Sequence, residues 1–165
     1  MTMSDRINEI LASMEEAKAA CGRRDEVQLM AVSKTHPYEA IQEALSCGLS
    51  LFGENRVQEI QGKFPQEHPG YQLHLIGHLQ SNKVKKAVAT VDAIDSIDSL
   101  RLARAVSKEA ERLGKVLPVL IEWNTSNEAS KAGFTELSDY EQLLDECASL
   151  GGISVRGLMT IGPLT

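Results

Sequence analysis

The chain has 165 residues, of which 42% are hydrophobic and 24% are charged, and its formal net charge at pH 7 is −6. This balance is typical of a single globular domain, here spanning residues 1–165, and the negative charge argues against nonspecific binding to nucleic acid or to an anionic membrane surface. No apolar run approaches the roughly 20 residues of a membrane span. The first ten residues carry Asp5, Arg6 and Glu9 and lack the apolar region of a secretory signal. We therefore expect a cytoplasmic protein.

The cysteines indicate neither a disulfide framework nor a metal site. Cys21, Cys47 and Cys147 are odd in number and far apart, and the sequence has no CxxC or Cys/His spacing of the kind that binds zinc. Cysteine often packs as a small apolar residue, so we expect three free thiols and no metal.

Apolar runs of strand length alternate with segments of helical periodicity along the chain. Glycine and proline separate many of them, as at Gly22, Pro37 and Gly48. In chain order, the predicted elements are a helix over 4–21, a strand over 27–34, a helix from 37 to about 48, a strand over 49–55, a helix over 56–63, a strand over 71–78, a helix over 82–89, a strand over 91–98, a helix over 99–113, a strand over 115–124, a loop over 126–135, a helix over 136–150 and a strand over 153–161.

This alternation predicts an α/β fold with a parallel sheet covered by helices. No GxGxxG or GxxxxGK[ST] motif follows a strand, so the usual nucleotide-binding loops are absent. Polar residues instead gather at the carboxyl ends of the strands, where such folds bind ligands: Lys34, Asn55, His78, Ser96, Asn124 and Thr160.

Two architectures fit the pattern, a TIM-type (β/α)8 barrel and an open doubly wound sheet. A complete barrel has eight strand–helix units and typically about 250 residues, whereas six strands are predicted here. We favour an incomplete barrel of about six strands, and we expect the sequence to be a C-terminally truncated portion of a longer chain that stops at the loop around Gly162 and Pro163.

Lys34 is the first candidate for chemistry, because it ends the apolar run 27–34 and is followed by Thr35, His36 and Pro37. A lysine at that point would project from the interior of a barrel, and partial burial would favour the neutral amine that attacks an aldehyde. The alternative is a solvated lysine at a strand end, since lysine side chains are mostly exposed.

Asn55 and His78 end the next two predicted strands, shortly after Gly53 and Gly77. Each glycine allows a close backbone approach or a tight turn beside the site. Either side chain could hydrogen-bond a cofactor ring or pack against it, although His78 could equally be a structural histidine.

The sequence does not decide the role of two further sets of charged residues. The three lysines within residues 83–86 follow a predicted helix start and could meet a phosphate, but a run of like charges is more often a solvated face. Three acidic residues could provide paired carboxylates for acid–base work, but the sequence does not fix their separation: Glu54, Asp95 and Glu122.

Six motifs occur together in one order. They are AVSKTHP around Lys34, FGENRVQE over 52–59, HLIGHLQSNK over 74–83, IDSID over 94–98, N-x-S-x-E-x-x-K-x-G-F over 124–134 and GLM over 157–159. With these motifs the chain resembles the pyridoxal phosphate homeostasis proteins from about Val27 onward. Each motif alone is weak, but the ordered set is specific.

The resemblance implies a single-domain barrel like the N-terminal domain of alanine racemase. It implies that Lys34 carries pyridoxal 5′-phosphate as a Schiff base. From their places at the ends of the next two strands, we expect Asn55 and His78 to lie beside it. The resemblance further implies a protein that binds, stores or hands over the cofactor, with pyridoxal-phosphate-requiring apoenzymes as partners and without established catalysis. The family continues with motifs that supply a phosphate cup and an arginine facing the pyridine nitrogen, and these do not occur in residues 1–165.

Two enzymatic functions remain as alternatives. One is a pyridoxal-phosphate-dependent amino-acid racemase, which would need a second base supplied with an additional β domain. The other is a Schiff-base aldolase that uses Lys34 without a cofactor.

Overall fold

The structure is a computed structural model that describes residues 1–65, 70–126, 128 and 132–162. Its elements are, in chain order, α1 (Met3–Ala20), β1 (Ala31–Val32), α2 (Tyr38–Ser46), β2 (Leu51–Glu54), α3 (Val57–Lys63), β3 (Gln72–Leu75), the 3₁₀ helix η1 (Ser81–Lys83), α4 (Val84–Thr90), β4 (Ala93–Ile97), α5 (Leu100–Arg112), β5 (Leu117–Glu122), α6 (Leu137–Cys147) and β6 (Ile153–Met159).

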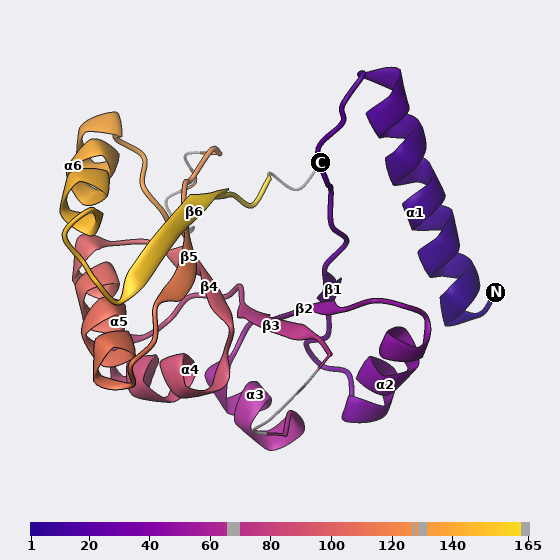
Figure 1. The fold of residues 1–165 in the computed structure, drawn as a ribbon, viewed down its shortest axis with the longest axis horizontal. Helices are drawn as coiled ribbons and strands as arrows, with labels where there is room; N and C mark the ends of the chain where they lie inside the picture. Colours follow the sequence, from indigo (N-terminus) through magenta and orange to yellow (C-terminus); the bar gives the residue numbers. More distant parts are fainter. Residues whose placement is uncertain (66–69, 127, 129–131, 163–165) are drawn as a thin grey trace.

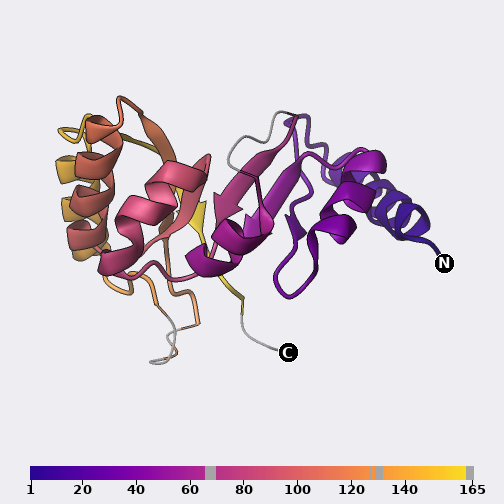
Figure 2. The same ribbon diagram turned by 90° about the horizontal axis from the view of Figure 1, so that it is seen from below.

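The six strands form one parallel sheet in the order β1-β2-β3-β4-β5-β6. Helices α2 to α6 lie along the outer side of this curved sheet (Figures 1 and 2). A doubly wound sheet reverses its strand order and places helices on both faces, so the sequential order excludes that alternative. The fold is that of a TIM-type barrel that the described strands do not close, because β1 and β6 each pair with one neighbour only.

The core lies between the sheet and its helices. Successive side chains of a strand point to opposite faces, and the parallel register sets Phe52 of β2 beside Leu73 of β3. Both are fully buried, as are Ile94 and Ile121 farther along the sheet. Burying each such side chain contributes about 1.5–3 kcal/mol, so the apolar runs that predicted the strands also hold the helices onto them.

The strand predicted over 27–34 is paired over Ala31 and Val32 alone. An apolar run predicts that a segment is buried. The segment pairs as a strand only where another strand lies beside it. β2 begins at Leu51, opposite residue 30 in this register, and the described strands offer β1 no neighbour on its other edge. The amino-terminal part of the run is therefore unpaired. The carboxyl end of the run is a turn, and Lys34 lies in that turn.

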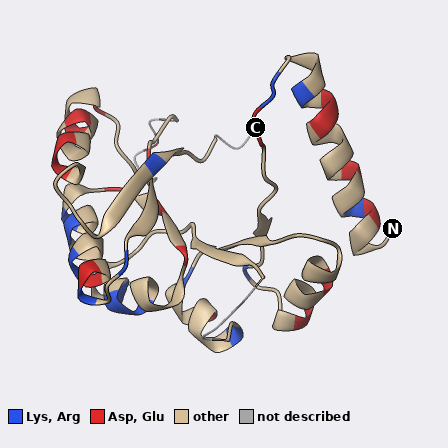
Figure 3. Ribbon diagram, viewed as in Figure 1, with Lys and Arg blue, Asp and Glu red and all other residues tan. Residues whose placement is uncertain are grey.

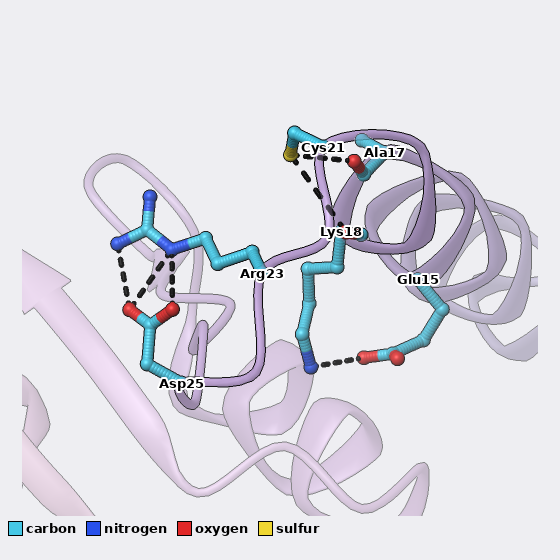
Figure 4. A network of polar contacts seen from close by, with 6 residues as sticks. All are labelled: Glu15, Ala17, Lys18, Cys21, Arg23 and Asp25. Atoms are coloured by element: carbon cyan, nitrogen blue, oxygen red, sulfur yellow. Dashed lines mark hydrogen bonds and ion pairs between the residues drawn. The ribbon is translucent and has the colours of Figure 1, made fainter.

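Helix α1 is less firmly attached to the sheet than the other helices. A reciprocal pair of hydrogen bonds between Thr2 and Asp5 caps its start, and Gly22, with a φ of 64°, follows its end. Figure 4 shows that end, where the thiol of Cys21 lies 2.9 Å from the carbonyl oxygen of Ala17. Ile7 is its buried residue, and an apolar groove of about 280 Å³ lies between α1, β1 and α2.

Charge is unevenly distributed over the outer helices (Figure 3). The three lysines within 83–86 divide, since Lys83 is partly buried whereas Lys85 and Lys86 are exposed on α4. In the part of the chain that the structure describes, no helix is long and apolar enough to cross a membrane. No group of histidine, cysteine or acidic side chains there could hold a metal ion.

The predicted loop over 126–135 falls partly outside the described residues. Its end returns to the sheet, where Phe134 forms an isolated parallel bridge with Trp123. Trp123 also packs edge-on against Tyr140 of α6, with 5.5 Å between ring centroids. The loop is therefore anchored at the carboxyl end of β5, beside the candidate site.

Candidate functional site

The three site residues predicted from the sequence follow neighbouring strands. The N–H of Ser33 donates to the carbonyl oxygen of Gly53 at 3.1 Å, which carries the β1–β2 pairing up to Lys34 and Asn55. An ideal Cβ built on Gly77 would lie 2.3 Å from the carbonyl oxygen of Asn55. Gly77 thus allows the segment leading to His78 to pass directly against Asn55, as a close backbone approach requires.

Asn55 and His78 line one depression of about 230 Å³, and Lys34 does not contribute to its wall. Most of the residues that line the depression are polar, and two of them are cationic, Arg56 and Lys83. The structure therefore brings Asn55 and His78 together and places Lys34 at the adjacent strand end. Arg56 is not among the residues that the sequence predicts for the site, and Lys83 is predicted there only as one of the three lysines within 83–86 that could meet a phosphate.

Lys34 itself is exposed, so the expected partial burial is wrong. The reason is that β1 is an edge strand, with β2 on one side and no described strand on the other. Among the described residues, the Lys34 side chain has no hydrogen-bond or ion-pair partner. It is a free primary amine at the carboxyl edge of the sheet.

His78 has a defined partner on the next strand end. Its Nδ1 lies 2.8 Å from Oδ2 of Asp98, and the His78 side chain remains 60% exposed. An ionised carboxylate only accepts hydrogen bonds, so Nδ1 carries the proton and donates it. Nε2 is then the acceptor nitrogen of the neutral ring. Asp98, the last residue of the IDSID motif, orients the ring.

Glu122 completes the row of polar residues at this edge. It ends β5 and is buried. Burial raises the pKa of its carboxyl group, the negative charge of Asp98 raises it further, and His78 acts in the opposite direction. From the sequence alone, Glu122 is only a possible acid–base group. Its distance from His78 and Asp98 depends on the sheet register, which the residue pattern does not give.

We expect Glu122→Gln to stabilise the protein at neutral pH. Because the pKa of Glu122 is raised on folding, the folded chain holds this proton more tightly than the unfolded chain, so the free energy of unfolding decreases as pH rises through the raised pKa. The substitution removes that loss. The midpoint of thermal unfolding should exceed that of the wild type at pH 7.5, and the difference should vanish below the ordinary value of 4.5. Glu141→Gln on α6 is the exposed control. A gain that is equal at pH 7.5 and pH 4 would contradict this account.

The other strand-end polar residues are held by the protein itself. The Ser96 hydroxyl donates to the carbonyl oxygen of Gly77 at 2.7 Å, and the Thr160 hydroxyl donates to that of Trp123 at 2.8 Å. The Asn124 amide donates to the carbonyl oxygen of Glu128 at 3.0 Å. These contacts stabilise the ends of β4, β5 and β6. The candidate site therefore includes fewer residues than the six strand-end residues that the sequence predicts.

A buried ion pair lies under the Lys34 turn and was not predicted. Glu54 of β2 is fully buried and pairs with Lys63 at the end of α3. The sequence indicates Glu54 as a possible acid–base group, whereas Lys63 belongs to no motif. A strand residue and a helix residue nine positions later meet here because α3 folds back over β2. The residue pattern gives no signal of that contact.

Comparison with known proteins gives one consistent result. Residues 6–164 match the family model described as "Alanine racemase, N-terminal domain". A pyridoxal phosphate homeostasis protein of Vibrio cholerae is 42% identical over 166 aligned positions, which cover 97% of this chain and 70% of that protein.

Two solved structures agree with this fold over most of the length of the chain. A structure described as that of an unknown protein from Bifidobacterium adolescentis has a TM-score of 0.87 and 34% identity, covering 96% of this chain and 69% of that one. A Synechococcus elongatus protein solved with pyridoxal phosphate bound has a TM-score of 0.76 and 36% identity. The match covers 92% of this chain and 71% of that protein's chain. The chain thus spans about 70% of the length of the relatives that it matches.

Proposed function

We propose a function for this chain from the family to which it belongs. The chain is a member of the alanine racemase N-terminal domain family and, within that family, of the pyridoxal phosphate homeostasis proteins. The proposed function is to hold pyridoxal 5′-phosphate as a Schiff base on Lys34 and to take part in intracellular homeostasis of that cofactor. The similar protein from Synechococcus elongatus, solved with pyridoxal phosphate bound, supports this assignment.

The observation that carries the proposal is the free amine of Lys34 at the carboxyl edge of a parallel sheet. It lacks a partner among the described residues, and Asn55 and His78 follow the next strands. An aldehyde-bearing ring fits this set, because an amine, an amide and an oriented imidazole are the groups that would bind it and hydrogen-bond its substituents. Pyridoxal phosphate supplies an aldehyde that condenses with a primary amine, with loss of water, to give a Schiff base that absorbs visible light.

Each side chain has a role that follows from its contacts. Lys34 provides the amine. Asn55, fixed against Gly77, can present its amide to a ring substituent. His78, whose Nδ1 donates to Asp98, can offer Nε2. Arg56 and Lys83 add positive charge to the depression beside Asn55 and His78, which favours an anionic ligand there.

The proposed role is that of a carrier and not of an enzyme. The relatives are named for homeostasis of the cofactor, and we propose that this chain acts in the cytoplasm and passes the cofactor to apoenzymes that require it. A racemase of this architecture would need a second base on the opposite face of the ring, supplied with an additional β domain.

An absorption spectrum tests the proposal. Adding pyridoxal phosphate to the purified protein should produce a visible band above that of the free cofactor, without interconversion of amino-acid enantiomers by the complex. Absence of the band would refute Schiff-base formation. Turnover of one enantiomer would identify a racemase, and cleavage of a carbonyl substrate without the cofactor would identify an aldolase.

We expect Asn55→Ala and His78→Ala to keep the fold and to weaken cofactor binding. Losing a hydrogen bond typically costs about 0.5–1.5 kcal/mol, so each substitution should raise the dissociation constant roughly two- to tenfold. Titration followed at the visible band would measure the change, and Gln72→Ala, at the exposed start of β3, would serve as the control. Unchanged affinity and spectrum in both variants would make the two residues structural.

A further inference from the structure

We propose that Lys63, held by Glu54, is a positioning residue that fixes the turn carrying Lys34 and thereby promotes Schiff-base formation at that amine. The inference rests on the proposed function. It extends that function to two residues that lie outside the ligand depression and on the helix side of the sheet.

The Lys63 ammonium is bound by three acceptors. Nζ donates to the carbonyl oxygen of Ser33 at 2.7 Å and to that of His36 at 3.0 Å, and it forms the ion pair with Glu54. An ammonium has three N–H donors, so this set uses all of them. The two carbonyl groups flank Lys34 and Thr35. A single charged group thus ties together both ends of the segment that presents the amine.

Glu54 anchors this clamp to the sheet. Its carboxylate is fully buried, and Oε1 accepts a hydrogen bond from the Ser33 hydroxyl at 2.7 Å as well as pairing with Lys63. Oε2 is buried and has no hydrogen-bond partner among the described residues. Apolar side chains would stabilise such a position as well as a buried ion pair does. The contacts of this pair therefore point to a geometric role.

The turn that the clamp holds is strained. Thr35 has a φ of 65°, in the left-handed region that a β-branched residue rarely adopts. The N–H of His36 closes the turn by donating to the carbonyl oxygen of Ser33 at 3.1 Å, the same oxygen that accepts from Lys63. Strained backbone of this kind persists where the surroundings over-determine it, and it clusters at functional sites.

These observations give Lys63 a role distinct from that of Lys34. The Nζ of Lys63 is engaged with three acceptors and its side chain is only 11% exposed, so it is not the amine that meets the aldehyde. β1 pairs with β2 over two residues, and the hydrogen bond from the Ser33 N–H to Gly53 is the last backbone contact between them before the turn. Without the clamp, Thr35 would relax toward a negative φ, and the Lys34 amine would lose its fixed direction.

The test measures how fast pyridoxal phosphate, followed by borohydride, labels Lys34 in the wild type and in Lys63→Met/Glu54→Gln. The double substitution removes both buried charges together, so neither is left unpaired. Lys86→Met, on the exposed face of α4, is the control. Rates are compared well below the midpoint of thermal unfolding, where a merely stabilising role would leave them unchanged. We expect labelling of Lys34 to slow about tenfold in the double variant, the factor that 1.4 kcal/mol gives, and to be unchanged in the control.

Adding Thr35→Gly to the double variant distinguishes positioning from stability. Glycine adopts a positive φ without strain, so most of the lost rate should return, and absence of recovery would contradict the role of the strained turn. If the double variant does not fold, the rate of Lys34 labelling in Lys63→Arg tests the positioning role instead. Its planar guanidinium keeps the charge beside Glu54 but cannot direct donors to both carbonyl groups as the ammonium does, and we expect about a threefold loss.

The outcomes separate the two proposals. A wild-type rate in the folded double variant, or in Lys63→Arg, overturns the positioning inference while selective labelling of Lys34 in the wild type leaves the proposed function standing. If the wild type shows no selective labelling of Lys34, the proposed function is overturned, and the inference that rests on it falls as well.

Discussion

Lys34→Ala should abolish the visible band that pyridoxal phosphate produces with the wild-type protein, leaving the spectrum of the free cofactor. The Lys34 side chain carries the only group assigned to the covalent bond, and alanine offers no amine. The fold should be unaffected, because Lys34 is exposed and has no side-chain partner among the described residues. Substitutions at such positions usually change stability by no more than about 0.5 kcal/mol.

Lys85→Ala is the matched control for this substitution. Lys85 is also exposed and lies on α4, away from the turn, so its removal should leave the band at full strength. Absorbance titration and thermal unfolding of both variants measure the two effects separately. A band that survives in Lys34→Ala would place the cofactor on another lysine.

Gly77→Ala should cause the largest loss of stability among the site variants considered. A Cβ at this position would lie 2.3 Å from the carbonyl oxygen of Asn55 and 2.8 Å from its Cα. Both are backbone atoms, so relief requires β2 and the segment after β3 to separate. Overpacking of this kind typically costs about 1–3 kcal/mol, which lowers the midpoint of thermal unfolding by roughly 2–12 °C in a domain of this size. Cofactor affinity should also decrease, because Asn55 is displaced.

Gly62→Ala tests whether steric contact is the cause. Gly62 lies in α3, and a Cβ there would have no neighbour within 4 Å. Alanine favours the helix over glycine by about 0.5–1 kcal/mol, so this variant should be slightly more stable than the wild type. If Gly77→Ala were as stable as Gly62→Ala, the close approach of Asn55 and Gly77 would be wrong.

Much of the fold could be predicted from the sequence, because burial and periodicity are local properties. The runs that became β2 to β5 are apolar in the sequence and largely buried in the structure. The helices between the strands begin and end within a few residues of their predicted bounds. β1 differs because strand pairing depends on neighbours. The apolar run 27–34 resembles a central strand, yet only Ala31 and Val32 pair with β2.

The site could be predicted only in part, for a related reason. Lys34, Asn55 and His78 were found because each follows an apolar strand, and in a parallel sheet strand ends meet at one edge. The contacts of Asp98 with His78 and of Lys63 with Glu54 join different elements, and they depend on how those elements pack. The exposure of Lys34 depends in turn on β1 being an edge strand, which a residue pattern does not reveal.

The measurement that tests the central claim most directly is mass spectrometry after borohydride reduction of the complex with pyridoxal phosphate. Reduction fixes the cofactor on the lysine that holds it, and trypsin does not cleave after a modified lysine. If Lys34 is that residue, the label will be found on one peptide that spans residues 25–56, from the cleavage after Arg24 to that after Arg56, with Lys34 uncleaved. A label found instead on Lys83 or Lys131, or spread evenly over the exposed lysines, would contradict the assignment of Lys34.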